Sequence, residues 1–231
     1  MPTIHWLGAG LSSAPGIRRL AASDRPFVLW NRTLSKALAA LGDDSGDARE
    51  LNWSELTTAV QPGDVVVSML PADLHQRVAD LCLQGGAHFV CSSYLSPAMD
   101  VLDAEAKAKG LRFVSEVGLD PGIDHLMAHV LMADYQASVL MNPTHEHRFR
   151  SYCGGFPSKP NDFRYKFSWS PLGVLRALKT PARWIEDGAE ATTEQPWKAL
   201  SSHTVNLPGG EETFQAYPNR DSIPFAEPYG F

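Results

Sequence analysis

Cysteine is scarce in this chain. Among 231 residues only Cys82, Cys91 and Cys153 occur, far apart and without a CxxC pair. A disulfide scaffold needs more cysteines at closer spacing, so that class of protein is excluded. Isolated thiols are typical of a reducing compartment. No basic segment followed by an apolar core marks a signal peptide, and we therefore predict a cytoplasmic protein.

Long apolar runs and excess positive charge are also lacking. No run is apolar enough to cross a membrane. The 20 Lys and Arg residues are outnumbered by 26 Asp and Glu, so neither a membrane protein nor a broad nucleic-acid-binding surface is predicted. Eight histidines are present, but His125 with His129 and His145 with His147 form no complete ligand set, and no metal site is predicted. At 44% hydrophobic, the chain can bury one large core or two small ones.

The first half of the chain alternates between two kinds of apolar pattern. Strands are predicted at residues 3–7, 27–30, 64–70, 88–91 and 111–117. Helices are predicted at residues 17–22, 53–60, 75–83 and 99–109. This alternation predicts a Rossmann-like, doubly wound parallel sheet of the α/β class. The ligands of such a sheet lie beyond the carboxyl ends of its strands.

The first predicted strand ends in Gly8-Ala9-Gly10, ahead of a predicted helix. Gly8 permits a tight turn, and Gly10 lets the backbone approach a pyrophosphate at the helix N-terminus. The third position of the dinucleotide fingerprint is Ser13 instead of glycine, and Gly16 follows shortly after. We expect the cofactor to contact Gly8, Gly10, Leu11, Ser12 and Ser13.

The second predicted strand ends without the carboxylate that usually holds the ribose hydroxyls of NAD. Arg32 and Lys36 offer cations there, and Thr33 offers a hydroxyl. These residue types suit a 2′-phosphate, although a solvated helix start has the same composition. We therefore predict NADP(H) as the cofactor, with Leu70 and Pro71 covering it from the end of another strand.

The stretch from Glu116 to His125 is predicted to join two domains. An aspartate directly before a proline is typical of a helix start, so Asp120-Pro121 is predicted to begin the helix that continues through residues 126–135. The boundary then separates a cofactor domain, 1–119, from a substrate domain, 120–231. The second domain is predicted to be α+β, with strands at 139–141 and 148–152 and a helix at 172–178.

Several motifs are similar to those of one enzyme family. They are Gly8-Ala9-Gly10, Ser93-Tyr94-Leu95-Ser96-Pro97-Ala98-Met99, Gly118-Leu119-Asp120-Pro121-Gly122-Ile123-Asp124-His125, Ser151-Tyr152-Cys153-Gly154-Gly155, Tyr165-Lys166-Phe167-Ser168-Trp169-Ser170 and Tyr217-Pro218-Asn219-Arg220-Asp221. In this order they resemble the saccharopine dehydrogenases of the glutamate-forming type. That family continues beyond the position equivalent to Phe231, so the second domain is expected to be incomplete.

The resemblance implies an NADP-linked oxidoreductase of lysine metabolism. It would interconvert saccharopine, a small amino-acid substrate, with L-glutamate and 2-aminoadipate 6-semialdehyde. Two alternatives stay open: a related carboxyalkyl-amine reductase of the carboxynorspermidine type, and a truncated NADP-binding protein without catalysis. The oligomeric state is also open, a homodimer included.

The resemblance also implies functional positions. The substrate site would comprise Ser93, Tyr94, Asp120 and Arg220. Ser168, like Leu70, would lie near the cofactor. Asp120, Cys153 and Tyr94 are candidates for carrying protons, but none of them is assigned as an essential acid or base.

Overall fold

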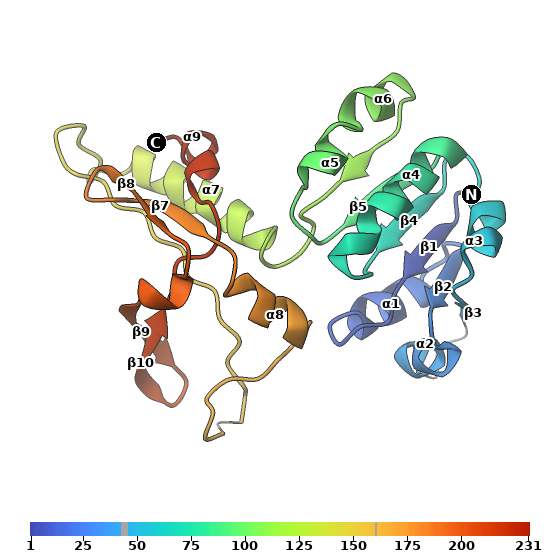
Figure 1. Cartoon of the computed structure of the whole chain (residues 1–231), viewed down its shortest axis with the longest axis horizontal. Coiled ribbons are helices and arrows are strands. Elements are labelled where there is room, and N and C mark those ends of the chain that lie inside the picture. Colours follow the sequence, from blue (N-terminus) through green and yellow to red (C-terminus); the bar gives the residue numbers. More distant parts are fainter. Residues whose placement is uncertain (43–45, 160) are drawn as a thin grey trace. The chain divides into compact units, whose positions relative to one another are not determined.

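A computed structural model describes residues 1–42, 46–159 and 161–231. The chain forms two compact units, Met1–Leu126 and Met127–Phe231 (Figure 1). The strands of the first unit are β1 (Ile4–Leu7), β2 (Phe27–Asn31), β3 (Asp47–Glu50), β4 (Val65–Ser68), β5 (His88–Cys91) and β6 (Phe113–Val114). Its helices are α1 (Ala14–Ala21), α2 (Leu34–Leu41), α3 (Trp53–Ala59), α4 (His75–Gly85), α5 (Pro97–Asp100), α6 (Asp103–Ala108) and the short 3-10 helix η1 (Ala72–Leu74).

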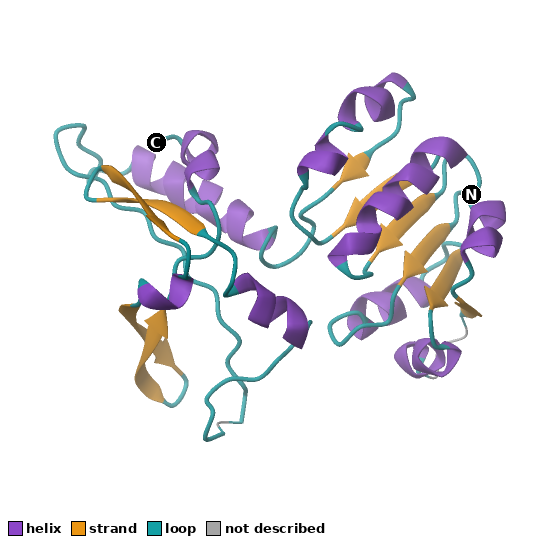
Figure 2. Ribbon diagram, in the orientation of Figure 1, coloured by secondary structure: helices purple, strands orange, loops and turns teal. Residues whose placement is uncertain are grey.

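The six strands form one parallel sheet in the order β3-β2-β1-β4-β5-β6 (Figure 2). The order reverses between β1 and β4, which are hydrogen-bonded neighbours although β2 and β3 separate them in sequence. In an open sheet of this kind, such a switch point is where the ligand crevice forms. The predicted doubly wound α/β fold is therefore confirmed.

Strand alternation creates two hydrophobic cores, one on each face of the sheet. Successive side chains of a strand point to opposite faces. Phe27 and Leu29 of β2 accordingly join the cluster that contains Ile17 of α1, whereas Val28 and Trp30 join the cluster of α3 and α4. This double burial explains why the central strands read as nearly continuous apolar runs.

A buried polar network ties the amino ends of β1 and β4 together. The Asp64 carboxylate accepts hydrogen bonds from the Thr3 and Gln61 backbone N–H groups, at 2.7 and 2.8 Å. The indole N–H of Trp30 donates to His5 Nδ1 at 3.1 Å. Because an indole can only donate, His5 must carry its proton on Nε2, which lies 3.2 Å from Asp64. Burial lowers the pKa of His5, so this contact is a hydrogen bond from a neutral ring.

Two predictions for the carboxyl-terminal part of the first unit are wrong. The strand predicted at residues 111–117 reduces to β6, because Glu116 adopts a φ of 63° and the chain leaves the ladder. The helix predicted at 99–109 divides into α5 and α6, with Leu102 N–H bonded to Met99 in a tighter i→i+3 turn. The polar strand β3 was not predicted, since its sequence, Asp-Ala-Arg-Glu, has no apolar pattern.

The second unit contains two separate antiparallel ribbons (Figure 2). Its elements are the main part of α7 (Ile123–Ala137), then α8 (Pro171–Ala177), β7 (Ala182–Glu186), β8 (Ala189–Thr193), β9 (Ser201–Leu207), β10 (Gly210–Ala216), α9 (Ala226–Tyr229) and the 3-10 helices η2 (Pro196–Lys198) and η3 (Ile223–Phe225). The strands predicted at 139–141 and 148–152 are not formed. Val139 is fully exposed, which shows that this short apolar run finds no partner strand. No helix among the described residues has the length and hydropathy of a membrane span.

Burial differs sharply between the two units. Both hydrophobic clusters consist of residues from the first unit. Among the described residues of the second unit, Ala128, Met132 and Ala182 are the buried hydrophobic side chains of the core, and Pro196 is also buried. The apolar stripe of α7 at Met127, Val130 and Leu131 is 57–66% exposed. The second unit therefore draws little stability from its own hydrophobic interior.

Candidate cofactor and substrate site

The turn after β1 has the geometry that the glycine motif predicts. Gly8 has a φ of 102°, and a Cβ at this position would lie 2.7 Å from the carbonyl oxygen of Met69, the residue directly after β4. Among the described residues, a Cβ at Gly10 would meet Ser13 Oγ alone, at the ordinary contact distance of 3.7 Å. The fold itself therefore requires glycine at position 8. None of the described residues crowds position 10, where the space is open to a ligand that approaches the backbone.

Gly16 has a packing role that the sequence analysis missed. A Cβ on Gly16, in the first turns of α1, would lie 2.9 Å from the indole ring of Trp6. Glycine here lets the helix approach β1 closely, which is the usual role of the third fingerprint glycine. Ser13 occupies the fingerprint position and is 2% exposed. The large Trp6 on the strand was the signal that a small residue was needed opposite it.

The N-terminus of α1 suits a phosphate electrostatically. The first turn of α1 contains no acidic residue, so the helix dipole and the N–H groups of the first turn are not opposed by a carboxylate. Ser13 N–H bonds to Gly10 O at 3.1 Å, which fixes the turn that leads into the helix. Leu11 and Ser12 are exposed on this turn.

The end of β2 presents the predicted cations beside this turn. Asn31 links the two loops, because its Oδ1 accepts Ala9 N–H at 3.0 Å and its Nδ2 donates to Thr33 O at 2.8 Å. The side chains of Arg32, Thr33 and Lys36 are exposed, and the first turn of α2 contains no acidic residue. The residues present therefore fit a cofactor with an additional phosphate on its ribose.

Two loops bring the predicted substrate residues of the first unit together, the loop after β5 and the loop after β6. Tyr94, after β5, donates its hydroxyl hydrogen to Asp120 Oδ1 at 2.7 Å. The backbone of Ser93 is held by Glu116, whose N–H donates to Ser93 O at 3.0 Å. Glu116 Oε1 in turn accepts Leu95 N–H at 3.0 Å. The loop after β6 thus positions the loop after β5 at the carboxyl edge of the sheet.

The loop that holds Asp120 is fixed by its own backbone. Gly118 N–H bonds to Pro121 O at 3.0 Å, and Ile123 N–H bonds to Gly118 O at 3.0 Å. Gly122 has a φ of 146°, and a Cβ there would lie 2.3 Å from Gly118 O. No other residue fits position 122, so the loop has little freedom to move Asp120.

The prediction that Asp120 begins a helix is wrong. The Asp120–Pro121 peptide bond is cis, and α7 begins only at Ile123. It is the Asp124 carboxylate that accepts a local backbone N–H, that of Gly122, at 2.7 Å. Asp120 therefore directs its carboxylate toward Tyr94 instead of capping the helix.

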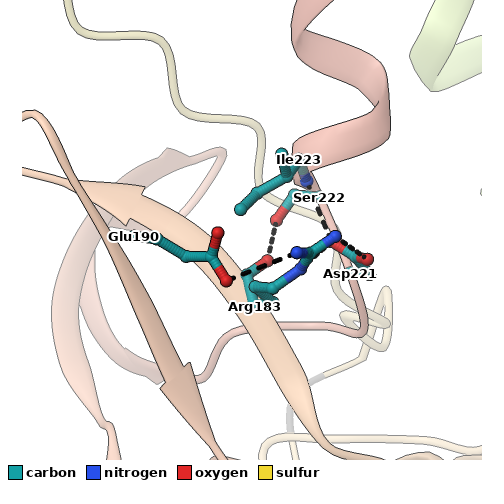
Figure 3. Close-up of polar contacts among 5 residues, drawn as sticks. All are labelled: Arg183, Glu190, Asp221, Ser222 and Ile223. Atoms are coloured by element: carbon teal, nitrogen blue, oxygen red, sulfur yellow. Dashed lines mark hydrogen bonds and ion pairs between the residues drawn. The ribbon is translucent and has the colours of Figure 1, made fainter.

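Arg220, predicted to bind substrate, lies in the second unit and directly precedes Asp221 in the sequence. Asp221 belongs to the ion cluster around Arg183 that Figure 3 shows. The φ of Arg220 is 55°, a backbone conformation that costs about 1–2 kcal/mol for a residue other than glycine. Arg183 on β7 holds this segment: its guanidinium forks onto the Asp221 carboxylate at 2.8 and 3.1 Å and reaches Glu190 at 3.3 Å. Its backbone N–H donates to Arg220 O at 2.9 Å, and its carbonyl accepts Ser222 N–H at 2.9 Å.

The remaining candidates of the second unit, Cys153 and Ser168, are exposed. Leu70 packs against the core cluster of α3 and α4, and Pro71 is exposed ahead of η1. Among the three cysteines, burial raises the pKa of the Cys82 thiol to about 12, so Cys82 stays protonated at neutral pH.

The sheet order, the glycine turn and the cations at the end of β2 define a dinucleotide-binding protein of the NADP class. Residues 4–114 match the saccharopine dehydrogenase NADP binding domain, and residues 118–231 match the saccharopine dehydrogenase C-terminal domain. The chain belongs to the saccharopine dehydrogenase family, as its motifs predicted, and its cofactor is NADP.

Comparison with individual relatives extends over nearly the whole chain. Saccharopine dehydrogenase [NADP(+), L-glutamate-forming] from Pyricularia oryzae is 36% identical over 98% of this chain and 51% of its own length. The mitochondrial alpha-aminoadipic semialdehyde synthase of Mus musculus is 38% identical over 77% of this chain and 19% of its own length. The apo structure of saccharopine dehydrogenase (L-Glu forming) from Saccharomyces cerevisiae superposes with a TM-score of 0.79 at 33% identity, over 99% of this chain and 52% of that one. The chain thus spans about half the length of the Pyricularia and Saccharomyces proteins.

Proposed function

We propose that the chain interconverts saccharopine with L-glutamate and 2-aminoadipate 6-semialdehyde, using NADP(H). The observation that carries this proposal is the Tyr94–Asp120 hydrogen bond of 2.7 Å at the carboxyl edge of the sheet. The hydroxyl and the carboxylate of this hydrogen bond belong to the same unit as the glycine turn and the cations near the start of α2. The matched relatives from Pyricularia oryzae and Saccharomyces cerevisiae are named for this same reaction, which supports the proposal.

The reaction joins an amine to an aldehyde and reduces the imine that forms. Condensation of glutamate with the semialdehyde releases water; hydride then adds to the imine carbon, and a proton at nitrogen completes the secondary amine of saccharopine. When bound, NADPH supplies that hydride. The protein must therefore hold several carboxylates and one nitrogen in a fixed geometry beside the cofactor.

We assign proposed roles to residues according to their contacts. Tyr94 directs its proton at Oδ1 of Asp120, and Oδ2 of Asp120 takes no part in the hydrogen bonds among the described residues. Oδ2 can therefore accept an N–H of the substrate nitrogen. Arg220 can form a fork onto a substrate carboxylate. Tyr94, Asp120 and Cys153 remain the candidates for proton transfer, and the substrate's own amine is a further proton carrier.

The proposed division of labour follows the two parts of the chain. Residues 1–119 would bind the cofactor, through Gly8, Gly10, Leu11, Ser12, Ser13, Arg32, Thr33, Lys36, Leu70 and Pro71, with Ser168 contributing from the second part. Residues 120–231 would bind the substrate together with Ser93 and Tyr94. We further propose a cytoplasmic location, supported by the absence of disulfides among the three cysteines, and a homodimer, supported by the exposed apolar stripe of α7. Cell fractionation and light scattering test these two points.

NADPH oxidation tests the proposed function. With L-glutamate and the semialdehyde, the chain should consume NADPH in step with saccharopine formation, whereas a polyamine in place of glutamate should give no turnover. Asp120→Asn should lower kcat/KM by about ten- to hundredfold, the effect of one hydrogen bond to a charged group. The matched variant Asp24→Asn changes an exposed carboxylate and should leave kcat/KM unchanged. Equal turnover with the polyamine, or NADPH binding without turnover of either pair, would contradict the proposal.

A further inference from the structure

Three polar side chains form a buried chain of hydrogen bonds behind the proposed substrate site. Ser68, at the end of β4, lies with its Oγ 2.9 Å from Nδ1 of His75. The other ring nitrogen of His75, Nε2, lies 2.8 Å from Ser93 Oγ. Ser68 is 0% exposed and His75 is 3% exposed. None of the roles assigned above accounts for Ser68 or His75.

The position of His75 fixes the ring between two strand ends. His75 is the first residue of α4, and its ring packs edge-on against Phe89 of β5, with 6.5 Å between the ring centroids. Burial lowers the pKa of His75, so the ring is neutral and carries a single N–H. Which nitrogen carries that proton decides which way both serine hydroxyls point.

The burial of Ser68 decides between the two arrangements. If His75 carried its proton on Nδ1, it would donate to Ser68, and the Ser68 hydroxyl would then need an acceptor of its own. The hydrogen bonds among the described residues give Ser68 Oγ no partner besides His75. A buried hydroxyl without an acceptor is strongly disfavoured. Ser68 therefore donates to Nδ1, and the proton of His75 lies on Nε2.

This arrangement has a consequence for Ser93. His75 Nε2–H donates to Ser93 Oγ, so the Ser93 hydroxyl accepts from the ring and must direct its own hydrogen elsewhere. We propose that His75 is a positioning residue: together with Ser68 it locks the Ser93 hydroxyl as a hydrogen-bond donor aimed at a carboxylate oxygen of the amino-acid substrate. The substrate part of this inference rests on the proposed function.

Nitrogen-15 NMR of the imidazole rings tests the proton position directly in the full chain. The His75 resonances, assigned by their loss in His75→Gln, should show a neutral ring with the proton on Nε2. In Ser68→Ala the preference of the His75 proton for Nε2 should weaken, because Nδ1 loses the hydrogen bond that the Ser68 hydroxyl donates to it. A wild-type ring protonated on Nδ1, or one that averages between both forms, would overturn the inference.

Saccharopine binding tests the consequence through a double-variant cycle. Ser93→Ala and His75→Asn should each weaken saccharopine binding by about ten- to hundredfold, the range for a hydrogen bond to a charged group. The combined variant should be no weaker than Ser93→Ala alone, because His75 acts through Ser93. His75→Gln, whose amide N–H reaches the place of Nε2–H, should restore binding to within about threefold. NADPH affinity should stay constant in every variant.

Additive losses of saccharopine affinity in the combined variant would show that His75 only supports the fold. The same conclusion would follow if His75→Gln bound saccharopine as weakly as His75→Asn. If the wild-type chain bound NADPH but not saccharopine, the proposed function would fail. The NMR result would still decide the proton position of His75 and the direction of the Ser93 hydroxyl, so the two failures can be told apart.

Discussion

Reversing the charge of Arg32 should remove the preference for NADP(H). Arg32 follows β2 directly, it is exposed, and no acidic residue in the first turn of α2 competes for it. A hydrogen bond to a charged group contributes about 1.5–3 kcal/mol. Two unit charges 4 Å apart in a water-like medium add about 1 kcal/mol of attraction or repulsion. Arg32→Asp should therefore weaken NADPH binding by about 2–4 kcal/mol, roughly 30- to 1,000-fold in Kd.

The change should be specific for the 2′-phosphate. Affinity for NADH, which lacks that phosphate, should change by less than about threefold, so the ratio of the two dissociation constants is the informative quantity. Arg19→Asp is the matched control, because it makes the same charge change on an exposed residue in the last turn of α1. It should leave the ratio unchanged.

Fluorescence titration with both cofactors at low and high salt measures this ratio. The effect of Arg32→Asp should shrink as the salt concentration rises, because exposed charges are screened. An unchanged ratio in Arg32→Asp, or an equal change in Arg19→Asp, would refute the assignment of Arg32 to the phosphate. In the first case Lys36→Glu would be the next variant to titrate.

Three further predictions concern stability. In Asp64→Asn, an amide N–H₂ group would face the N–H donors of Gln61 and His5. Urea unfolding should show that the free energy of unfolding falls by about 2–5 kcal/mol. A decrease below about 1 kcal/mol would contradict the role of the Asp64 network. The pKa values of His5 and His75 are lowered from 6.5, so below about pH 6.5 the unfolded chain binds more protons than the folded chain. The free energy of unfolding should therefore fall as the pH drops below about 6.5. Equal free energies of unfolding at pH 5.5 and pH 7.5 would contradict this reasoning. Hydrogen exchange should be faster in the second unit, where few side chains are buried, and equal protection would contradict that expectation.

The parts of the fold that could be predicted from the sequence are those where burial leaves a pattern. The strand β4 lies inside the sheet and the helix α4 packs against it, so the buried apolar residues of both elements leave a recognisable sequence pattern. The glycine motif was also readable, because Gly8 needs a positive φ and Gly10 needs open space. Local rules of this kind do not depend on distant parts of the chain.

The features that could not be predicted depend on contacts between distant residues. The edge strand β3 is polar, and only its pairing with β2 makes it a strand. The side chain of Asp120 accepts a hydrogen bond from Tyr94, 26 positions away, and α7 begins only at Ile123, so the helix start that Asp-Pro normally indicates is not formed there. The ion pair of Arg183 could not be predicted either, because its partner Asp221 is 38 positions away and no local motif around Asp221 points to β7.

Isotope transfer tests the central claim most directly. The chain would be incubated with L-glutamate, 2-aminoadipate 6-semialdehyde and NADPH carrying deuterium at the transferable position of its nicotinamide, and the product would be analysed by mass spectrometry. An NADP-linked saccharopine dehydrogenase should form saccharopine that contains one deuterium, and Asp120→Asn should form it more slowly. Oxidation of NADPH without labelled saccharopine, or no reaction at all, would contradict this account.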